Sequence, residues 1–491
     1  MLHISDIKKF SRCKKLYYLS KKETEPSEYF SFFNINVSID DSISKKLNIE
    51  NAYIGVKNDP TERAMEAMHN YDWLKNARFE YEQLRIKVPF MHKVEEGWDL
   101  YFSSLQLAPG AEDAGTFAFY VTVLKRLGIQ VHEVYVVHLN REYIREDVLD
   151  DEQLWVVSNF FYNGSGNPSK HILTTIYGIT TNMDEVLHQM KEFDFDAELP
   201  IEKTSKCTRR NKCMYYDECF PYVEEEPDNS ILHLATSKNK FKMYDDGILY
   251  LKDADLELVE GTRLQYAQIM ADRLGGFFMD KLALKSWFDS ISSQSATFLD
   301  FEWDTYCIPP YRAMKPLQTL PFQYSIHILQ DDNEVIHKEY LGVGDCREEL
   351  IQQLMEDIPS EGKIFAYNAK GAEALRLQEL AVAFPQYEDV INSWINRMED
   401  LSIPFEMGML YDVRMRGMYS LKVLNKMIHP EHTYQELKVS HGLEAVQIHR
   451  MLEHENGEEK IIEYRKQLLE YCAMDTSELL AVYKWLKQLI V

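Results

Sequence analysis

The sequence predicts an α/β protein built from several domains, and three observations carry that prediction. Short apolar runs typical of buried strands, such as 134–139, alternate with segments of helical periodicity, such as that around 468–476. A chain of 491 residues is long enough for two or three domains, each with its own core. A hydrophobic content of 45% with 27% charged residues is ordinary for a soluble globular protein. We expect domains at 1–225, 226–294 and 295–491, with the acidic, proline-containing stretch 224–229 at the first boundary.

Composition also restricts the cellular compartment and the kinds of partner that we expect for the protein. No apolar run is long enough to span a bilayer, and residues 1–6 lack the charged-then-apolar order of a signal peptide. Seven cysteines in so long a chain do not suggest a secreted disulfide scaffold, so we expect a cytoplasmic protein with no membrane partner.

The net charge of −25 argues against a broad basic surface for long duplex DNA, but it does not exclude a local groove. Basic residues crowd the loop at 203–212 and the first helix, where they form either such a groove or a solvated face: Lys8, Lys9, Arg12, Lys14, Lys15, Lys21 and Lys22.

Residues 1–294 contain further elements that periodicity predicts. We expect a buried strand at 134–139 and a strand-like segment at 172–177. The stretch 226–294 should contain short strands around 231–234 and 248–251, then helices near 262–274 and 279–291.

Four cysteines of the N-terminal region are candidate metal ligands. Cys207, Cys213 and Cys219 are evenly spaced, and Cys13 is the other cysteine in this half of the chain. Three neighbouring thiolates need a fourth ligand for a tetrahedral zinc site or a cubane cluster, and Cys13 is the natural donor. The spacing does not separate Zn²⁺ from [4Fe–4S], and unligated thiols are the plain alternative.

The run 297–303 is the strongest single signal for catalysis. Apolar residues lead into Asp300, Phe301 and Glu302, so alternation places both carboxylates on one face at the exit of a buried strand. Two carboxylates at such a place repel each other, and a hard divalent cation such as Mg²⁺ or Mn²⁺ relieves that repulsion. The plain alternative is a pair of polar residues on a solvated strand edge.

A helical segment near the C-terminus supplies a partner for those carboxylates. Tyr471 and Asp475 are four residues apart and therefore share one helix face. Asp475 can serve as a third metal ligand, and Tyr471 can hold or deprotonate an attacking water. A core tyrosine beside a solvated aspartate is the alternative for these two residues taken alone.

Between these motifs we expect strands at 322–329, 335–341 and 363–368, then a helix that carries Glu373. Arg414, Arg416 and Lys422 surround the loop 417–420, where they contact substrate phosphates or are scattered surface charges.

The strand D-x-E and the helical Y-x-x-x-D together resemble the DnaQ-like 3′–5′ exonucleases of the DEDD type, tyrosine subtype. The resemblance implies an RNase H-like mixed sheet flanked by helices and a pair of Mg²⁺ or Mn²⁺ ions that cut phosphodiesters. It also implies a fourth acid after the strand at 363–368. Glu373 is our candidate for that acid, with Asp400 in reserve.

The cysteine pattern resembles the RecB-like iron–sulfur nucleases of CRISPR systems and DNA-end processing. The whole chain is similar to an uncharacterised bacterial family that joins such a module to a DnaQ-like domain. This resemblance implies a [4Fe–4S] cluster that pins the two ends of a PD-(D/E)xK, restriction-endonuclease-like module together. The motif itself is lost in the expected hairpin 84–91 and 98–104, where Phe102 and Ser104 replace the acid and lysine, and Tyr120 replaces a glutamine of the next helix. We therefore expect an inactive nuclease fold.

These expectations combine into a metal-dependent 3′–5′ exonuclease that acts on single-stranded DNA or RNA. A non-catalytic iron–sulfur scaffold with protein partners in a defence or repair complex is one alternative. A phosphodiesterase for short oligonucleotides is another, and it would suit the acidic charge better.

Overall fold

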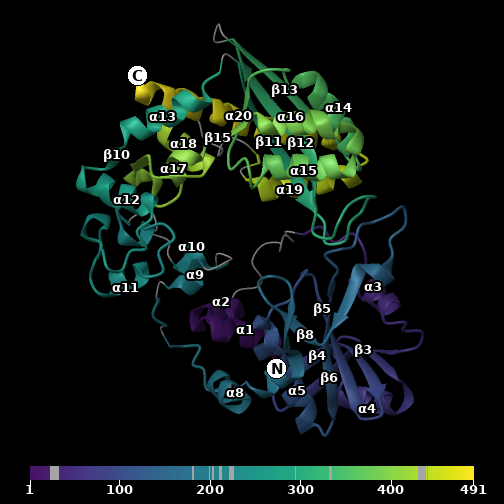
Figure 1. Cartoon of the computed structure of the whole chain (residues 1–491). Helices are drawn as coiled ribbons and strands as arrows, with labels where there is room; N and C mark the ends of the chain where they lie inside the picture. The colour runs from purple at the N-terminus through teal and green to yellow at the C-terminus, as the bar shows by residue number, and fades with distance from the viewer. Residues whose placement is uncertain are drawn as a thin grey trace. The chain divides into compact units, whose positions relative to one another are not determined.

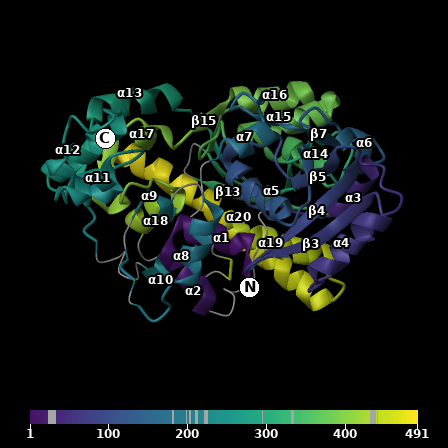
Figure 2. The same cartoon turned by 90° about the horizontal axis from the view of Figure 1, so that it is seen from below.

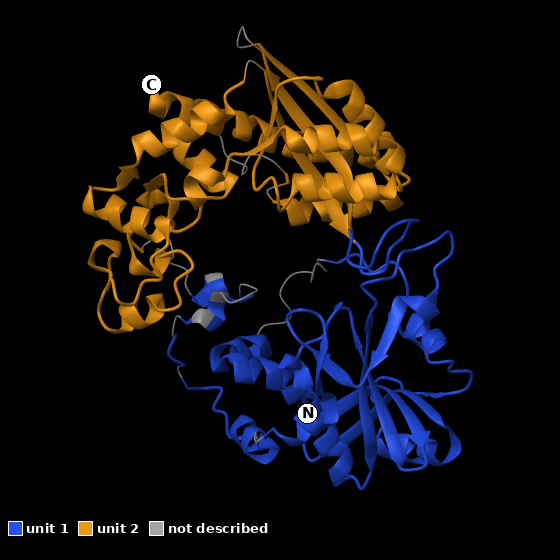
Figure 3. Cartoon of the chain, viewed as in Figure 1, with its two compact units in different colours: residues 1–219, 306–318 blue, residues 220–305, 319–491 orange. Residues whose placement is uncertain are grey.

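The computed structural model describes residues 1–22, 33–179, 182–197, 199–201, 204–208, 213–219, 226–293, 295–330, 334–429, 438–439 and 441–491. They form two compact units, unit 1 with residues 1–219 and 306–318, and unit 2 with residues 220–305 and 319–491 (Figure 3). The expected connector 226–294 therefore belongs to unit 2 and is not a separate part. The physical reason is a shared core, in which Leu264 and Phe288 of this stretch pack with Phe298 of the sheet.

Unit 1 is built on a seven-stranded mixed sheet with the order β2-β3-β4-β5-β6-β7, and β1 pairs with β4. Strands β3, β4 and β5 form an antiparallel meander, and β6 then runs parallel to β5 after helix α5. The strand predicted at 134–139 is confirmed as part of β6. The strands are β1 (Leu2–His3), β2 (Tyr53–Ile54), β3 (Trp73–Tyr81), β4 (Leu84–Val94), β5 (Gly97–Ser104), β6 (Val131–Leu139) and β7 (Trp155–Ser158), with a separate hairpin of β8 (Phe160–Tyr162) and β9 (Pro168–His171).

The helices of unit 1 alternate with these strands along the chain, from α1 directly after β1 to α10 at residue 219 (Figure 1). They are α1 (Ile4–Arg12), α2 (Lys14–Lys22), α3 (Ile39–Lys46), α4 (Thr61–Asn70), α5 (Ala114–Arg126), α6 (Asp151–Leu154), α7 (Ile172–Tyr177), α8 (Met183–Lys191), α9 (Ser205–Thr208) and α10 (Tyr216–Cys219).

Two predictions from local pattern are wrong. Residues 172–177 form helix α7, because His171 accepts the Thr174 N–H at the helix start and Ile172 and Ile176, four apart, are buried on one face. The short strands expected around 231–234 and 248–251 are reduced to a 3₁₀ turn at Ile231–His233 and one isolated bridge between Ser230 and Tyr250.

Unit 2 is built on a five-stranded sheet with the order β13-β12-β11-β14-β15. Strand β12 pairs antiparallel with both β13 and β11. Strand β14 then pairs parallel with β11 on one side and with β15 on the other. The strands predicted at 322–329 and 335–341 are confirmed. Bounds are β11 (Ala296–Thr305), β12 (Thr319–Leu329), β13 (Val335–Leu341), β14 (Lys363–Ala366) and β15 (Met398–Asp400), and a separate pair consists of β10 (Phe277–Met279) and β16 (Leu410–Asp412).

The helices of unit 2 cover both faces of this sheet. Leu299 and Phe301 of β11 pack with residues of α14, α15 and α16 on one face, and Phe298 packs with residues of α13, α18 and α20 on the other. The helices are α11 (Lys240–Asp245), α12 (Arg263–Arg273), α13 (Lys281–Ile291), α14 (Arg347–Asp357), α15 (Glu373–Ala383), α16 (Glu388–Asn396), α17 (Ile403–Glu406), α18 (Leu421–Ile428), α19 (Gly442–His454) and α20 (Glu458–Ile490). The helices predicted near 262–274 and 279–291 are thus confirmed as α12 and α13.

Helix α20, yellow in Figure 2, has 33 residues and contacts β11, β12 and β13. Neither α20 nor any other helix of the described ranges is both long and apolar enough to cross a membrane.

Candidate metal-binding active site

Strand β11 presents Asp300 and Glu302 on the same face of the unit 2 sheet. The intervening Phe301 is only 2% exposed and points into the core beneath α14–α16, so alternation directs both carboxylates to the opposite face. The register places Asp300 beside Ser325 and Glu302 beside Gln323 of β12. The shared face that the sequence predicts is confirmed.

Helix α20 crosses this face with a fixed rotation. Three contacts, spaced one helical turn apart, hold it: Gln323 Nε2 donates to Leu468 O at 2.8 Å, Cys472 Sγ lies 3.7 Å from Asp300 Oδ2, and Thr476 Oγ1 lies 2.8 Å from His327 Nδ1. Tyr471 comes directly before Cys472, and Asp475 comes directly before Thr476. Because these two residues are four apart and share a helix face, the same rotation brings both close to β11.

The carboxylates of Asp300, Glu302 and Asp475 come together. One oxygen from each lies within 4.8 Å of the other two, and no other group of three such ligands forms within the described ranges. Burial is the largest cause that raises the pKa of Asp300 well above its ordinary range, and Asp475, Glu373 and Glu302 raise it further. The pKa of Glu302 is raised by burial and by Asp475 in the same way. Because these carboxylates are buried and lie close together, ionising all of them at once is unfavourable.

Glu373 lies at the start of α15 and is 2% exposed. Burial raises its pKa to about 8, and Asp400 and Asp475 add to that rise. Its Oε2 is buried without a hydrogen-bond partner. It lies outside the 4.8 Å group, yet it raises the pKa of both Asp300 and Glu302. A buried oxygen without a donor, beside three clustered carboxylates, fits a divalent cation that prefers oxygen ligands.

Asp400, the reserve candidate, ends β15 close to Glu373. Its Oδ1 accepts the backbone N–H groups of Asn368 at 3.0 Å and Ser402 at 2.8 Å. These bonds stabilise the turn after β15. Because Asp400 Oδ1 is occupied in this way, Glu373 remains the better candidate for the fourth acid.

Tyr471 is 4% exposed and borders the acidic cluster. Burial is the largest cause that raises its pKa, followed by Asp475, Glu302 and Asp300. The hydroxyl therefore stays protonated at neutral pH and can donate a hydrogen bond. This condition favours a role in orienting water over a role as a base.

Lys422, in the first turn of α18, is a cation close to this cluster. Its Nζ lies 5.1 Å from the centre of the Tyr471 ring, and its charge lowers the pKa of Glu302. The two arginines grouped with it by sequence are engaged elsewhere. Arg414 pairs with Asp412 at 2.6 Å, and Arg416 donates to Glu226 O at 2.9 Å.

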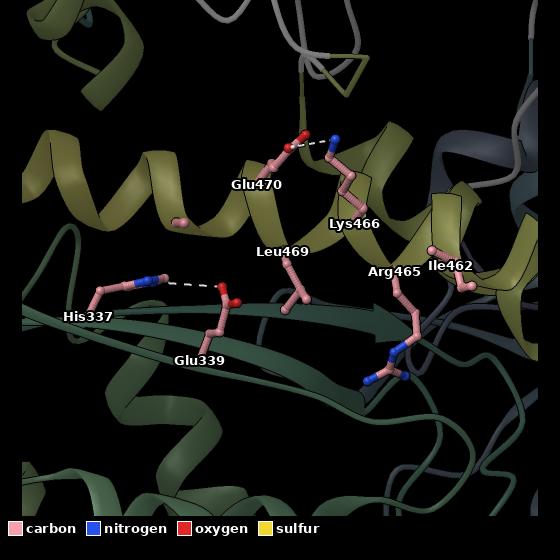
Figure 4. Close-up of a pocket in the computed structure, with 8 residues that line it drawn as sticks. His337, Glu339, Ile462, Arg465, Lys466, Leu469 and Glu470 are labelled. Atoms are coloured by element: carbon pink, nitrogen blue, oxygen red, sulfur yellow. Dashed lines mark ion pairs between the residues drawn. The ribbon is translucent and has the colours of Figure 1, made fainter. Parts of the chain in front are cut away.

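The other flank of α20 faces away from the acids. There it forms an open groove of about 560 Å³ with β13, into which Leu469 points above His337 and Glu339 (Figure 4). Glu470 pairs with Lys466 at 3.6 Å on the side of the helix turned from the strands. Glu470 is therefore an acid of the same helix that lies outside the cluster.

Sequence reasoning missed the residues that fix α20. The sequence pattern assigns no role to Gln323, His327, Cys472 or Thr476. One signal was available, since Leu468, Cys472 and Thr476 repeat at intervals of four.

In unit 1, the structure brings part of the cysteine set together. Cys213 N–H donates to Cys207 O at 2.8 Å. Burial raises the pKa of Cys219, and the nearby thiols of Cys213 and Cys13 raise it further. Within the described residues, no three of these sulfurs lie within 4.8 Å of one another.

The expected hairpin of unit 1 is present as β4 and β5, and aromatic rings lie at the positions singled out for the PD-(D/E)xK pattern. The Phe102 ring stacks on Phe117 with centroids 4.3 Å apart, and the Tyr120 ring meets Phe102 edge-on at 4.9 Å. These side chains offer no carboxylate to a cation.

Comparison with known protein families gives a match that lies mostly in unit 2. A family described as a domain of unknown function (DUF2779) matches residues 297–420, which include Asp300, Glu302, Glu373 and Asp400 but end before Tyr471 and Asp475. No curated protein and no solved structure matches the chain. The similarity that can be stated is therefore to DUF2779, over about a quarter of the sequence.

Proposed function

We propose that this protein is a metal-dependent 3′–5′ exonuclease that hydrolyses single-stranded DNA or RNA to nucleoside monophosphates. The observation that carries the proposal is the gathering of Asp300, Glu302 and Asp475 within 4.8 Å, from a strand and a helix far apart in sequence. Such a cluster of buried carboxylates is stable as an ionised group only with a cation beside it.

Asp300, Glu302, Asp475 and Glu373 would hold Mg²⁺ or Mn²⁺. When bound, two such ions activate water and neutralise charge on the attacking and leaving oxygens of a phosphodiester. The protonated Tyr471 hydroxyl would orient the attacking water. Lys422, on the same side of the cluster, would contact a phosphate oxygen of the substrate.

The sheet of unit 2 supports this assignment. Its order β13-β12-β11-β14-β15, with three antiparallel strands followed by two parallel ones, is similar to the mixed sheet of RNase H-like folds. Asp300 and Glu302 lie on the central strand β11, where β12 pairs with both, just beyond the point at which pairing with β14 ends at Phe298.

For unit 1 we propose an inactive nuclease fold that helps to hold the strand. The meander β3-β4-β5, helix α5 and parallel strand β6 support a restriction-endonuclease-like module, and Phe102, Ser104 and Tyr120 supply no metal site. Cys13, Cys207, Cys213 and Cys219 would bind a [4Fe–4S] cluster, or Zn²⁺ in its place. Such a cytoplasmic protein would act alone or within a defence or repair complex.

The test uses one oligonucleotide labelled at either end, with Mg²⁺ or Mn²⁺. The wild-type protein should shorten the 5′-labelled strand stepwise and should release the label of the 3′-labelled strand as a mononucleotide. Asp300→Ala should do neither, and Glu470→Gln should behave like the wild type. Equal digestion by wild type and Asp300→Ala, or no digestion with any divalent ion, would refute the proposal. Binding of the strand without cleavage would favour the scaffold alternative.

A further inference from the structure

Unit 1 contains a pocket of about 270 Å³ between α1, β5 and α5. Its lining includes Lys8 of α1, Phe102 and Ser104 of β5, and Thr116, Phe117 and Tyr120 of α5. Sites for whole small molecules usually measure roughly 300–1,000 Å³. The size therefore suits a single ring system better than a complete nucleotide.

Several aromatic rings line this pocket. Phe102 and Phe117 are nearly parallel, with an interplanar angle of 18°, and Phe117 and Phe161 continue the series at 10° with centroids 6.1 Å apart. Phe161 also lines the pocket. The Tyr120 ring, which also lines the pocket, meets Phe102 at 71°, so the lining offers both ring faces and a ring edge to a planar nucleobase.

Polar groups at the same pocket complement a nucleotide. The hydroxyls of Ser104 and Thr116 can bond to the polar edge of a base. Lys8 pairs with Asp113 at 3.4 Å, but the two side chains are 56% and 38% exposed, and such surface pairs contribute little. A phosphate can therefore take the place of Asp113 beside Lys8.

Helix α1, which borders the pocket, and the next helix α2 are basic, unlike the chain as a whole, although the pocket lining itself pairs Lys8 with Asp113. Helices α1 and α2 lie within residues 1–22, which carry seven lysines and arginines against the single acid Asp6, while the whole chain has a net charge of −25. Lys14 lies over the Phe10 ring and Lys15 over the Tyr18 ring, so the cations alternate with aromatic faces. This composition is typical of surfaces that follow a single strand.

We propose that this pocket seats one base of a single-stranded nucleic acid whose phosphates lie along α1 and α2. The choice of ligand rests on the function proposed above, but the site is distinct from the acids of unit 2. In this reading the aromatic residues that replaced a nuclease motif form a holding site for the strand.

The test measures binding apart from cleavage. The protein carries Asp300→Asn and Asp475→Asn, and fluorescence anisotropy compares a labelled 12-mer with a strand of the same length that lacks bases. The strand with bases should bind at least about fivefold more tightly, as expected for one stacked base. Thr116→Met, which fills the pocket, should abolish that preference. Lys8→Gln should weaken both strands and reduce the slope of log K against log salt by about one.

Lys125→Gln, at the far end of α5, is the matched control and should change nothing. Thermal melting checks that each variant is folded, and Ser104→Met is the second filling variant if Thr116→Met is not. Equal binding of strands with and without bases, an unchanged preference in both filling variants, or no strand binding by the folded protein would each overturn the inference. The binding measurement uses protein whose acids at 300 and 475 are already replaced. Its outcome therefore does not depend on whether the wild-type protein cleaves the strand.

Discussion

The thiol Sγ of Cys472 lies 3.7 Å from Oδ2 of Asp300, although 172 residues separate the two in sequence. This contact joins the middle of α20 to the middle of β11. It lies between the two residues of α20 that the site needs, since Tyr471 precedes Cys472 and Asp475 follows it by three positions. Packing of this small buried side chain, together with the contacts at Leu468 and Thr476, therefore sets the distance between the helix and the strand acids.

Asp475→Asn should remove most of the stabilisation of the protein by Mn²⁺. A ligand that binds only the folded state at 100 times its dissociation constant adds about 2.7 kcal/mol to the free energy of unfolding. Removal of one clustered carboxylate should eliminate most of that gain, whereas Glu470→Gln should retain it. Calorimetric melting temperatures with and without Mn²⁺ provide the measurement. A Mn²⁺ response that survives in Asp475→Asn would mean that the ion binds elsewhere.

Glu373 should make the metal-free protein less stable as the pH rises. Its pKa is raised from 4.5 to about 8, so between these values the folded state holds a proton that the unfolded state has lost. The free energy of unfolding must then fall as the pH rises from about 5 to 8, by on the order of a few kcal/mol. Glu373→Gln imitates the protonated acid and should remove this part of the pH dependence.

Urea unfolding at pH 5 and pH 8 in the presence of a chelator measures the effect of Glu373. Wild type and Glu373→Gln should differ most at pH 8, with the variant more stable. Identical pH dependence of the two proteins would show that Glu373 does not carry the buried proton.

Lys422→Met should raise KM for the nucleic-acid substrate while it leaves the binding of metal largely unchanged. Loss of a cation that contacts a phosphate raises KM, and the salt dependence of KM should decrease with it. The metal-induced rise in melting temperature should persist. Lys426→Met, one turn later on α18 and exposed, is the matched control. Equal effects of the two substitutions on KM would remove Lys422 from the site.

Tyr471→Phe should lower kcat while it leaves the metal-induced stabilisation intact. The substitution removes only the hydroxyl, and a group that positions a proton or water typically contributes about 100-fold or more. Single-turnover cleavage at saturating Mn²⁺ gives the rate. A variant with the wild-type rate would show that the hydroxyl takes no part in the reaction, and one that no longer binds Mn²⁺ would show a structural role.

Local sequence pattern was sufficient to predict which site residues share a face of a single strand or a single helix. Alternation predicted that Asp300 and Glu302 share a face, and the interval of four predicted the same for Tyr471 and Asp475. It failed at 172–177, where β-branched residues indicated a strand but a capping His171 and the burial of Ile172 and Ile176 favoured a helix. There, burial on one face outweighed the preference of the residues themselves.

The sequence by itself therefore determined the mixed α/β class, the main strands of the unit 2 sheet and the identity of the acidic residues. Only the tertiary structure decided that stretch 226–294 joins unit 2, that Lys422 faces the cluster while Arg414 and Arg416 do not, and that Cys472 touches Asp300. The reason is that periodicity specifies which face of an element a side chain occupies. Which faces meet depends on the packing of segments far apart in the chain, and no local pattern contains that information.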